Sequence, residues 1–251
     1  MSGVYIMAVI TIVLTTVLCI AFLNYLTHSN RRYYWLLLVG LPSSFIVNHW
    51  VKIPPITALA TWAGIPLKIS FETPIWFIAA ILLNAPIFEE AIKLLPIALP
   101  VSRKLMNDAP GSLWTGLALG MSFGLGEAAY IAHGIAQSPE YNSLPWYVFT
   151  GYATERLIVT FAHGFMTSIA AYGVYKGGGN AFMGYFSAVG LHALINLGPI
   201  LLALKLIPAS GSSMTTYISI LGAFLLFQRY TRTARTMSGK EKEEIVYFER
   251  R

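Results

Sequence analysis

Apolar residues occur along this chain in runs long enough to cross a membrane, and short polar stretches separate one run from the next. Seven runs can be recognised, near residues 4–27, 33–51, 74–99, 112–137, 146–175, 181–204 and 213–230. A membrane-spanning helix needs about 20 such residues, so the pattern predicts an all-α, multi-pass membrane helix bundle with about seven transmembrane helices. Only 11% of the residues are charged, against about 25% in soluble domains. We expect one integral domain over residues 1–230 and a charged cytoplasmic tail over 231–251.

The basic residues predict how the bundle is oriented. If seven spans alternate, twelve Lys and Arg residues fall on one side of the membrane: Arg31, Arg32, Arg103, Lys104, Lys176, Arg229, Arg232, Arg235, Lys240, Lys242, Arg250 and Arg251. The other side has three, which are Lys52, Lys68 and Lys205. Loops rich in Lys and Arg remain in the cytoplasm, so we expect an outer N-terminus, a cytoplasmic C-terminus and a place in the cell membrane. Charge placed at span ends indicates contact with the lipid bilayer, and it does not indicate nucleic acid binding.

One proline-rich stretch lies between the second and third runs. The segment from Lys52 to Ser70 reads KIPPITALATWAGIPLKIS and is too short for a further span. Irregular backbone at membrane depth is tolerated only where protein or water covers it. We therefore expect a re-entrant or interfacial segment on the outer face.

Ionisable residues inside the apolar runs are the most informative feature. Glu89, Glu90 and Lys93 lie in the third run. A charge at the bilayer centre costs at least about 2.5–3.5 kcal/mol, and such residues are functional candidates by default. Three further runs contribute Glu127, Glu155, Arg156, His163, His192 and Asn196. Together these residues define a candidate site.

Helical spacing sorts these residues by direction and depth. Glu89 and Lys93 are four residues apart and can pair, while Glu90 points about 100° away. At about 1.5 Å of rise per residue, two layers are expected. The inner layer holds Glu89, Glu90, His163 and His192, and the outer layer holds Glu127, Glu155 and Arg156. Gly116, Gly120 and Gly124 repeat every four residues in the fourth run, which allows another helix to approach closely.

The inner layer contains the groups needed to hydrolyse an amide. A carboxylate in an apolar site can act as general base for a bound water, and a histidine beside it can orient that water. An imidazole and an Asn side chain can hold a developing oxyanion. Three alternatives remain: a buried network that only stabilises the bundle, a transporter path, and a zinc site of two histidines and a glutamate. The helical H-E-x-x-H pattern of zinc proteases is missing.

Four segments in order resemble a known group of membrane proteins. They read FEEAIKLL (88–95), GLALGMSFGLGEAAY (116–130), ERLIVTFAHGFMT (155–167) and HALIN (192–196). This set is similar to the PrsW-type and YhfC-type membrane peptidases, of the superfamily that includes the CAAX prenyl endopeptidases and bacteriocin-processing proteases. Lys93 stands where the CAAX group has arginine, as in PrsW-like members. The sequence EAAY replaces the ENxxY usual in PrsW members and leans toward the YhfC side.

The resemblance implies a glutamate-dependent intramembrane protease fold. It implies catalytic roles for Glu89, Glu90, His163, His192 and Asn196, and supporting roles for Lys93, Glu127, Glu155 and Arg156. We therefore expect an endopeptidase that cleaves a membrane-associated or membrane-spanning protein through a glutamate- and histidine-activated water. We favour this glutamic type over a metalloprotease and expect no cofactor. Because the superfamily also resembles a non-catalytic subunit, the alternative is a membrane scaffold or binding subunit of the same fold.

Overall fold

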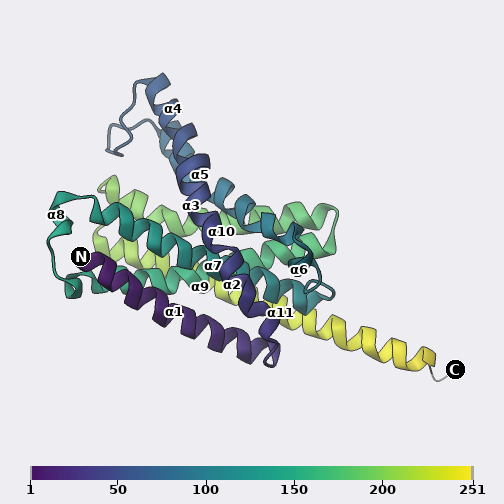
Figure 1. The fold of residues 1–251 in the computed structure, drawn as a ribbon. Helices are drawn as coiled ribbons and strands as arrows, with labels where there is room; N and C mark the ends of the chain where they lie inside the picture. Colours follow the sequence, from purple (N-terminus) through teal and green to yellow (C-terminus); the bar gives the residue numbers. More distant parts are fainter. Residues whose placement is uncertain (1, 250–251) are drawn as a thin grey trace.

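The computed structural model describes the backbone of residues 2–249 and the side chains of residues 2–239, and every regular element in this part is helical (Figure 1). The longer helices are α1 (Gly3–Thr27), α4 (Ile53–Ala63), α5 (Ile75–Leu94), α7 (Ala109–Ala136), α9 (Thr150–Lys176), α10 (Gly179–Ala203) and α11 (Ala209–Glu249). Short elements connect them: η1 (Arg31–Trp35), α2 (Leu36–Val39), α3 (Leu41–Ile46), η2 (Val47–Lys52), η3 (Leu95–Ala98), α6 (Pro100–Arg103), α8 (Pro139–Asn142) and η4 (Trp146–Phe149). The multi-pass helical bundle predicted from the apolar runs is confirmed.

Six helical stretches among the described residues are long and apolar enough to cross a membrane. They cover Gly3–Thr27, Arg31–Ala63, Ile75–Ala98, Trp146–Lys176, Gly179–Ala203 and Ala209–Gly239. The remaining predicted span, 112–137, forms α7, which is 28 residues long and runs through the centre of the bundle. Its small residues suit a helix that is covered by other helices instead of by lipid.

The second predicted span ends later than expected and is broken. It continues past residue 51 as far as Ala63, so the boundary predicted there is wrong. Its middle, η2, is a π-helical turn that ends at Lys52, two residues before Pro54 and Pro55. The Asn84 side chain donates to the Lys52 carbonyl at 3.0 Å and ties this turn to α5. The turn directs Lys52 into the bundle, and the placement of this lysine on the outer face is corrected.

The predicted glycine stripe packs α7 against α9. A Cβ atom on Gly120 would collide with the His163 carbonyl, and one on Gly124 would lie 2.7 Å from the Thr160 Cα. Helices approach this closely only where side chains are absent. The stripe therefore fixes α9, and with it His163, against α7.

The last helix continues through the predicted tail. α11 extends from Ala209 to Glu249 and projects beyond the bundle at the C-terminal end (Figure 1). Ala234 is fully buried, and the Arg235 guanidinium lies 5.7 Å from the centre of the Trp114 ring. The first turns beyond residue 230 therefore pack on the bundle. The division of the chain at this residue stays a prediction.

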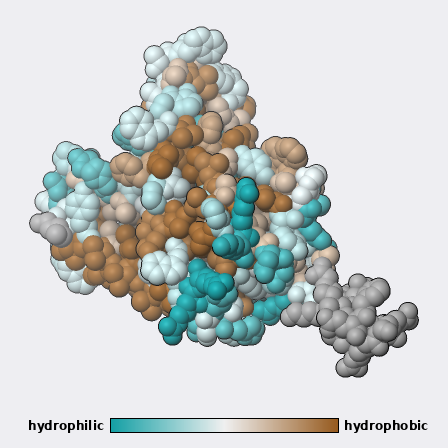
Figure 2. Space-filling view, turned by 45° about the vertical axis from the view of Figure 1, so that its right-hand side comes forward, coloured by the Kyte–Doolittle hydropathy of each residue, from teal (hydrophilic) through white to brown (hydrophobic). Residues whose placement is uncertain are grey.

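The outer surface is largely apolar. Figure 2 shows hydrophobic residues across the middle of one face, with hydrophilic residues gathered mainly along its lower edge and left end. In Figure 1, α4 and the first half of α5 diverge from the other helices, and we call residues 53–80 the arm. Trp62 and Ile75 in the arm are 81% and 85% exposed. Large exposed apolar patches mark contact surfaces in soluble proteins, but on a membrane-spanning helix they face lipid.

Candidate active site

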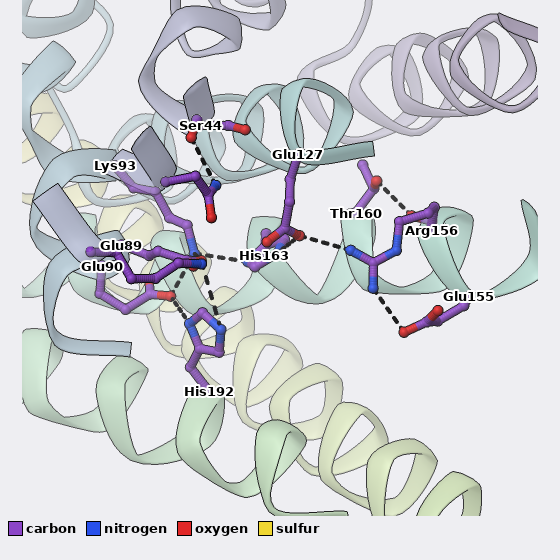
Figure 3. A network of polar contacts seen from close by, with 12 residues as sticks. Ser44, Glu89, Glu90, Lys93, Glu127, Glu155, Arg156, Thr160, His163 and His192 are labelled. Carbon is purple, nitrogen blue, oxygen red and sulfur yellow. Dashed lines mark hydrogen bonds and ion pairs between the residues drawn. The ribbon is translucent and has the colours of Figure 1, made fainter. Parts of the chain in front are cut away.

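Four helices bring the predicted polar residues into one buried network (Figure 3). α5 contributes Glu89, Glu90 and Lys93, α7 contributes Glu127, α9 contributes Glu155, Arg156 and His163, and α10 contributes His192. All of these except Glu155 are buried, with exposed fractions of 9% or less. The sequence prediction that these residues converge agrees with this geometry.

The two glutamates of α5 have different surroundings. Glu90 is completely buried, and its Oε1 accepts from Lys93 Nζ at 2.6 Å and lies 2.8 Å from His192 Nδ1. Glu89 Oε1 instead accepts from Lys52 Nζ at 2.7 Å, while its Oε2 has no hydrogen-bond partner. Lys93 Nζ is 4.0 Å from Glu89 Oε2. The expected ion pair between Glu89 and Lys93 is therefore longer than the ion pair between Glu90 and Lys93. Glu90 Oε2 likewise has no hydrogen-bond partner, so each glutamate keeps one oxygen free.

The protons on the two histidines follow from their partners. A carboxylate can only accept, so His192 Nδ1 carries hydrogen and donates to Glu90. Its Nε2 then has a free lone pair and lies 3.8 Å from Glu89 Oε2. Two acceptors that face each other at this distance leave room for a donor or a cation between them. This gap is the chemically most distinctive point of the site.

His163 is held from both sides. The Lys93 ammonium, which can only donate, lies 2.8 Å from Nδ1. Nε2 therefore carries hydrogen and donates to Glu127 Oε2 at 3.1 Å. The ring also contacts Phe123 and His192, with ring centres 5.2 and 5.3 Å apart. Its tautomer and orientation are thereby fixed.

Glu127 joins the two expected layers. Its Oε2 also accepts from Arg156 Nη1 at 2.9 Å, and Arg156 Nη2 donates to Glu155 Oε1 at 2.8 Å. The Glu155 side chain is 57% exposed, so the network reaches the surface there. The two expected layers are therefore connected, because one carboxylate bonds to residues of both.

A cavity of about 210 Å³ borders this network. Its polar lining consists of Lys52, Glu89, Glu127, Glu155, Arg156, His163, His192, Asn196 and Thr216. Glu90 and Lys93 are not part of the lining. Asn196 is half-buried, and its side chain has no hydrogen bond within the described residues. Its amide is free to donate into the cavity.

Lys52 is the site residue that the sequence did not reveal. In the sequence, Lys52 lies close to two prolines and looks like the last residue of a span. In the structure, the π-helical turn places its side chain against Glu89. π-helical turns occur frequently at functional sites. A lysine in a long apolar stretch is the signal that could have indicated this role.

The residues present fit a divalent metal ion. Glu89, His163 and His192 each offer one ligand atom, and these atoms lie within 4.8 Å of one another. Two histidines and a carboxylate form a common catalytic zinc set. The second ring nitrogen of His192 is held by Glu90, as is usual for a metal-bound histidine. Lys93, which donates to His163, is the competing cation.

A cluster of buried acids and histidines thus lies beside a cavity inside a multi-pass helical bundle, an arrangement that can support hydrolysis within a membrane. A family model described as PrsW family intramembrane metalloprotease matches residues 3–227. The chain belongs to this family of membrane proteases, and the PrsW-type resemblance seen in the sequence is confirmed. No curated protein and no solved structure matches the chain.

Proposed function

We propose that the protein is an endopeptidase that hydrolyses a peptide bond of a membrane-associated protein, with a water molecule activated by Glu89 in the cavity. One observation carries this proposal: Glu89 is 1% exposed, borders the cavity, and has one carboxylate oxygen without a partner. An unpaired carboxylate oxygen at a cavity wall is a strong acceptor for the proton of a water.

The neighbouring residues have distinct proposed roles. His192 Nε2 faces the free oxygen of Glu89 at 3.8 Å, so both groups can bind one water. Glu90 acts through His192, because its carboxylate accepts from Nδ1 and fixes the ring. It is a positioning residue, and Glu89 is the base. This choice rests on the cavity lining, which contains Glu89 and not Glu90.

A positively charged group and a hydrogen-bond donor also lie at the cavity beside Glu89. Lys52 Nζ lies 2.7 Å from Glu89 Oε1 and holds this carboxylate in position at the cavity wall. The Asn196 amide lines the cavity and can donate to the oxyanion that forms at the scissile carbonyl. Donors placed for that charge are often the largest contribution to catalysis. Glu127 accepts from His163 and from Arg156, and in this way it orients the His163 ring.

The experiment compares new protein N-termini in membranes of cells that produce the wild type or E89Q. Glutamine keeps the shape of the side chain and removes its basicity, so we expect the new termini to fall by about 100-fold or more. E140Q is the matched control, since Glu140 is exposed and does not line the cavity. A folded E89Q protein with unchanged cleavage would exclude Glu89 as the base. Loss of folding alone in E89Q would favour the scaffold alternative.

A metal-dependent peptidase is the second candidate, favoured by the Glu89, His163 and His192 cluster. A divalent ion held there would polarise a carbonyl and make a bound water more acidic. Elemental analysis of the purified protein tests this directly. We expect one bound equivalent in the wild type and loss in H192A if this candidate is right. Full activity after dialysis against a chelator, with no bound metal, would leave the glutamate-activated water.

A further inference from the structure

A second cavity lies at the end of the bundle where α1 passes into η1 and α6 passes toward α7. Its volume is about 450 Å³, and it is lined by Arg32, Trp35, Pro100, Val101, Lys104 and Leu105. None of these residues lines the candidate active site. The cavity is therefore a separate feature of the fold, and its chemistry must be explained on its own.

The two cations of this cavity lack partners. Arg32 and Lys104 are exposed, and within the described part of the chain neither forms an ion pair. The nearest acid in the sequence, Asp108, accepts from the Gly111 N–H at 2.6 Å and caps α7. Two unpaired cations that line one cavity attract an anion.

The remaining walls are apolar and their backbone is held in place. Trp35 and Val101 are 67% and 44% exposed, and Leu105 is buried. The Asn30 side chain accepts from the Arg32 N–H at 3.2 Å, which fixes the turn of η1. Tyr33 is buried and donates to the Leu105 carbonyl at 3.4 Å, which ties the two walls together. These contacts hold the backbone of both cavity walls in place.

We propose that this cavity binds an anionic phospholipid, with its phosphate between Arg32 and Lys104 and the start of its acyl chains against Trp35, Val101 and Leu105. A guanidinium binds phosphate through two parallel hydrogen bonds. Tryptophan prefers the level of the lipid headgroups, and basic pockets between membrane helices suit anionic headgroups. The volume lies in the range of small-molecule sites. A free phosphate would use the cations and leave the apolar wall uncovered.

The test uses the full chain in a neutral detergent. Phosphatidylglycerol, phosphatidylcholine and inorganic phosphate are added in turn, and bound lipid is counted by native mass spectrometry. We expect phosphatidylglycerol to remain bound to the wild type and to bind at least about five-fold more weakly to R32Q/K104Q. The charge-matched control is R31Q/R232Q, because Arg31 and Arg232 are exposed and do not line the cavity. This control should bind as the wild type does.

Three results would overturn the proposal. Equal binding by R32Q/K104Q and the wild type would mean that the lipid binds elsewhere. Equal weakening in both double variants would mean that general surface charge attracts the lipid. Displacement of the lipid by millimolar inorganic phosphate would identify a free-anion site instead. If R32Q/K104Q does not fold, phosphatidylglycerol binding is measured on R32K instead. This variant keeps the charge and loses the two parallel hydrogen bonds of the guanidinium, so it should bind the lipid more weakly than the wild type.

Discussion

The α7–α9 pair and the arm form the two extremes of this molecule. In an 18-residue apolar stretch of the span that contains α9, 72% of the residues are buried, against 22% in such a stretch of the span that contains α5. Gly120 allows α7 to touch the His163 backbone, and the Ser168 hydroxyl donates to the Leu113 carbonyl across the same interface. The arm instead exposes Trp62 and Ile75. One region is closely packed by protein, and the other exposes large apolar side chains.

The candidate active site lies where these regions meet. Glu127 and His163 belong to the packed pair. Lys52 directly precedes the arm in the chain, and Glu89 follows it. Substitutions in the packed pair should therefore affect stability first. Substitutions near the arm should affect activity more than stability. The experiments below test this separation, from the largest expected effect on stability to the smallest.

E127A should cause the largest loss of stability. It removes the carboxylate that accepts from both Arg156 and His163 and leaves a buried guanidinium without its main partner. Breaking a buried ion pair from one side costs about 3–5 kcal/mol. Unfolding in a denaturing detergent measures this loss. E155A is the control, since an exposed pair contributes about 0–1 kcal/mol, and equal effects would contradict the account.

K52M should give a smaller loss of stability and a marked loss of cleavage. It removes a hydrogen bond between charged groups, which contributes about 1.5–3 kcal/mol, and it leaves Glu89 with Lys93 at 4.0 Å. The cleavage rate and the unfolding free energy are measured on the same preparation. K68M removes an exposed lysine in the arm loop and should change neither. A fully active K52M would show that this lysine does not support Glu89.

G120A should destabilise the α7–α9 pair by about 1–3 kcal/mol, because the added methyl collides with the His163 carbonyl. G134A lies on the same helix, where a Cβ meets nothing within 4 Å. There the exchange should be neutral or stabilising by up to about 1 kcal/mol. Thermal unfolding separates the two variants. Equal melting temperatures would show that the close approach of these helices is not tight.

W62A should have the smallest effect on stability, within about 0.5 kcal/mol, because the side chain is 81% exposed on the arm. W114A is the contrasting variant, since Trp114 is 5% exposed and packs on Phe227. Its loss should cost about 3–5 kcal/mol. Unfolding free energies of both proteins provide the comparison. A costly W62A would mean that the arm is packed against something other than lipid.

The sequence predicted the parts of the fold that depend on simple periodicity. Apolar runs identified the helices, and spacing along each helix brought Glu89, Glu90, His163 and His192 to one place. The glycine stripe correctly indicated a close helix contact, at Gly120. These predictions succeed because they depend on local geometry alone.

What the sequence could not provide depends on the backbone and on contacts between helices. The π-helical turn before Pro54 directs Lys52 inward, and no periodicity reveals such a turn. Lys93 pairs with Glu90 at 2.6 Å and not mainly with Glu89, because His163 draws the ammonium to one side. Glu127 bonds to residues of both expected layers. The sequence could not show this, because the depth of Glu127 in the bundle depends on how α7 lies against α9.

The most direct measurement is the cleavage rate of E89Q beside that of E140Q, on preparations shown to be equally folded by their thermal unfolding. If the free carboxylate oxygen of Glu89 activates the attacking water, E89Q loses about 100-fold or more of the rate and E140Q keeps it. If E89Q cleaves as fast as E140Q, Glu89 is not the base.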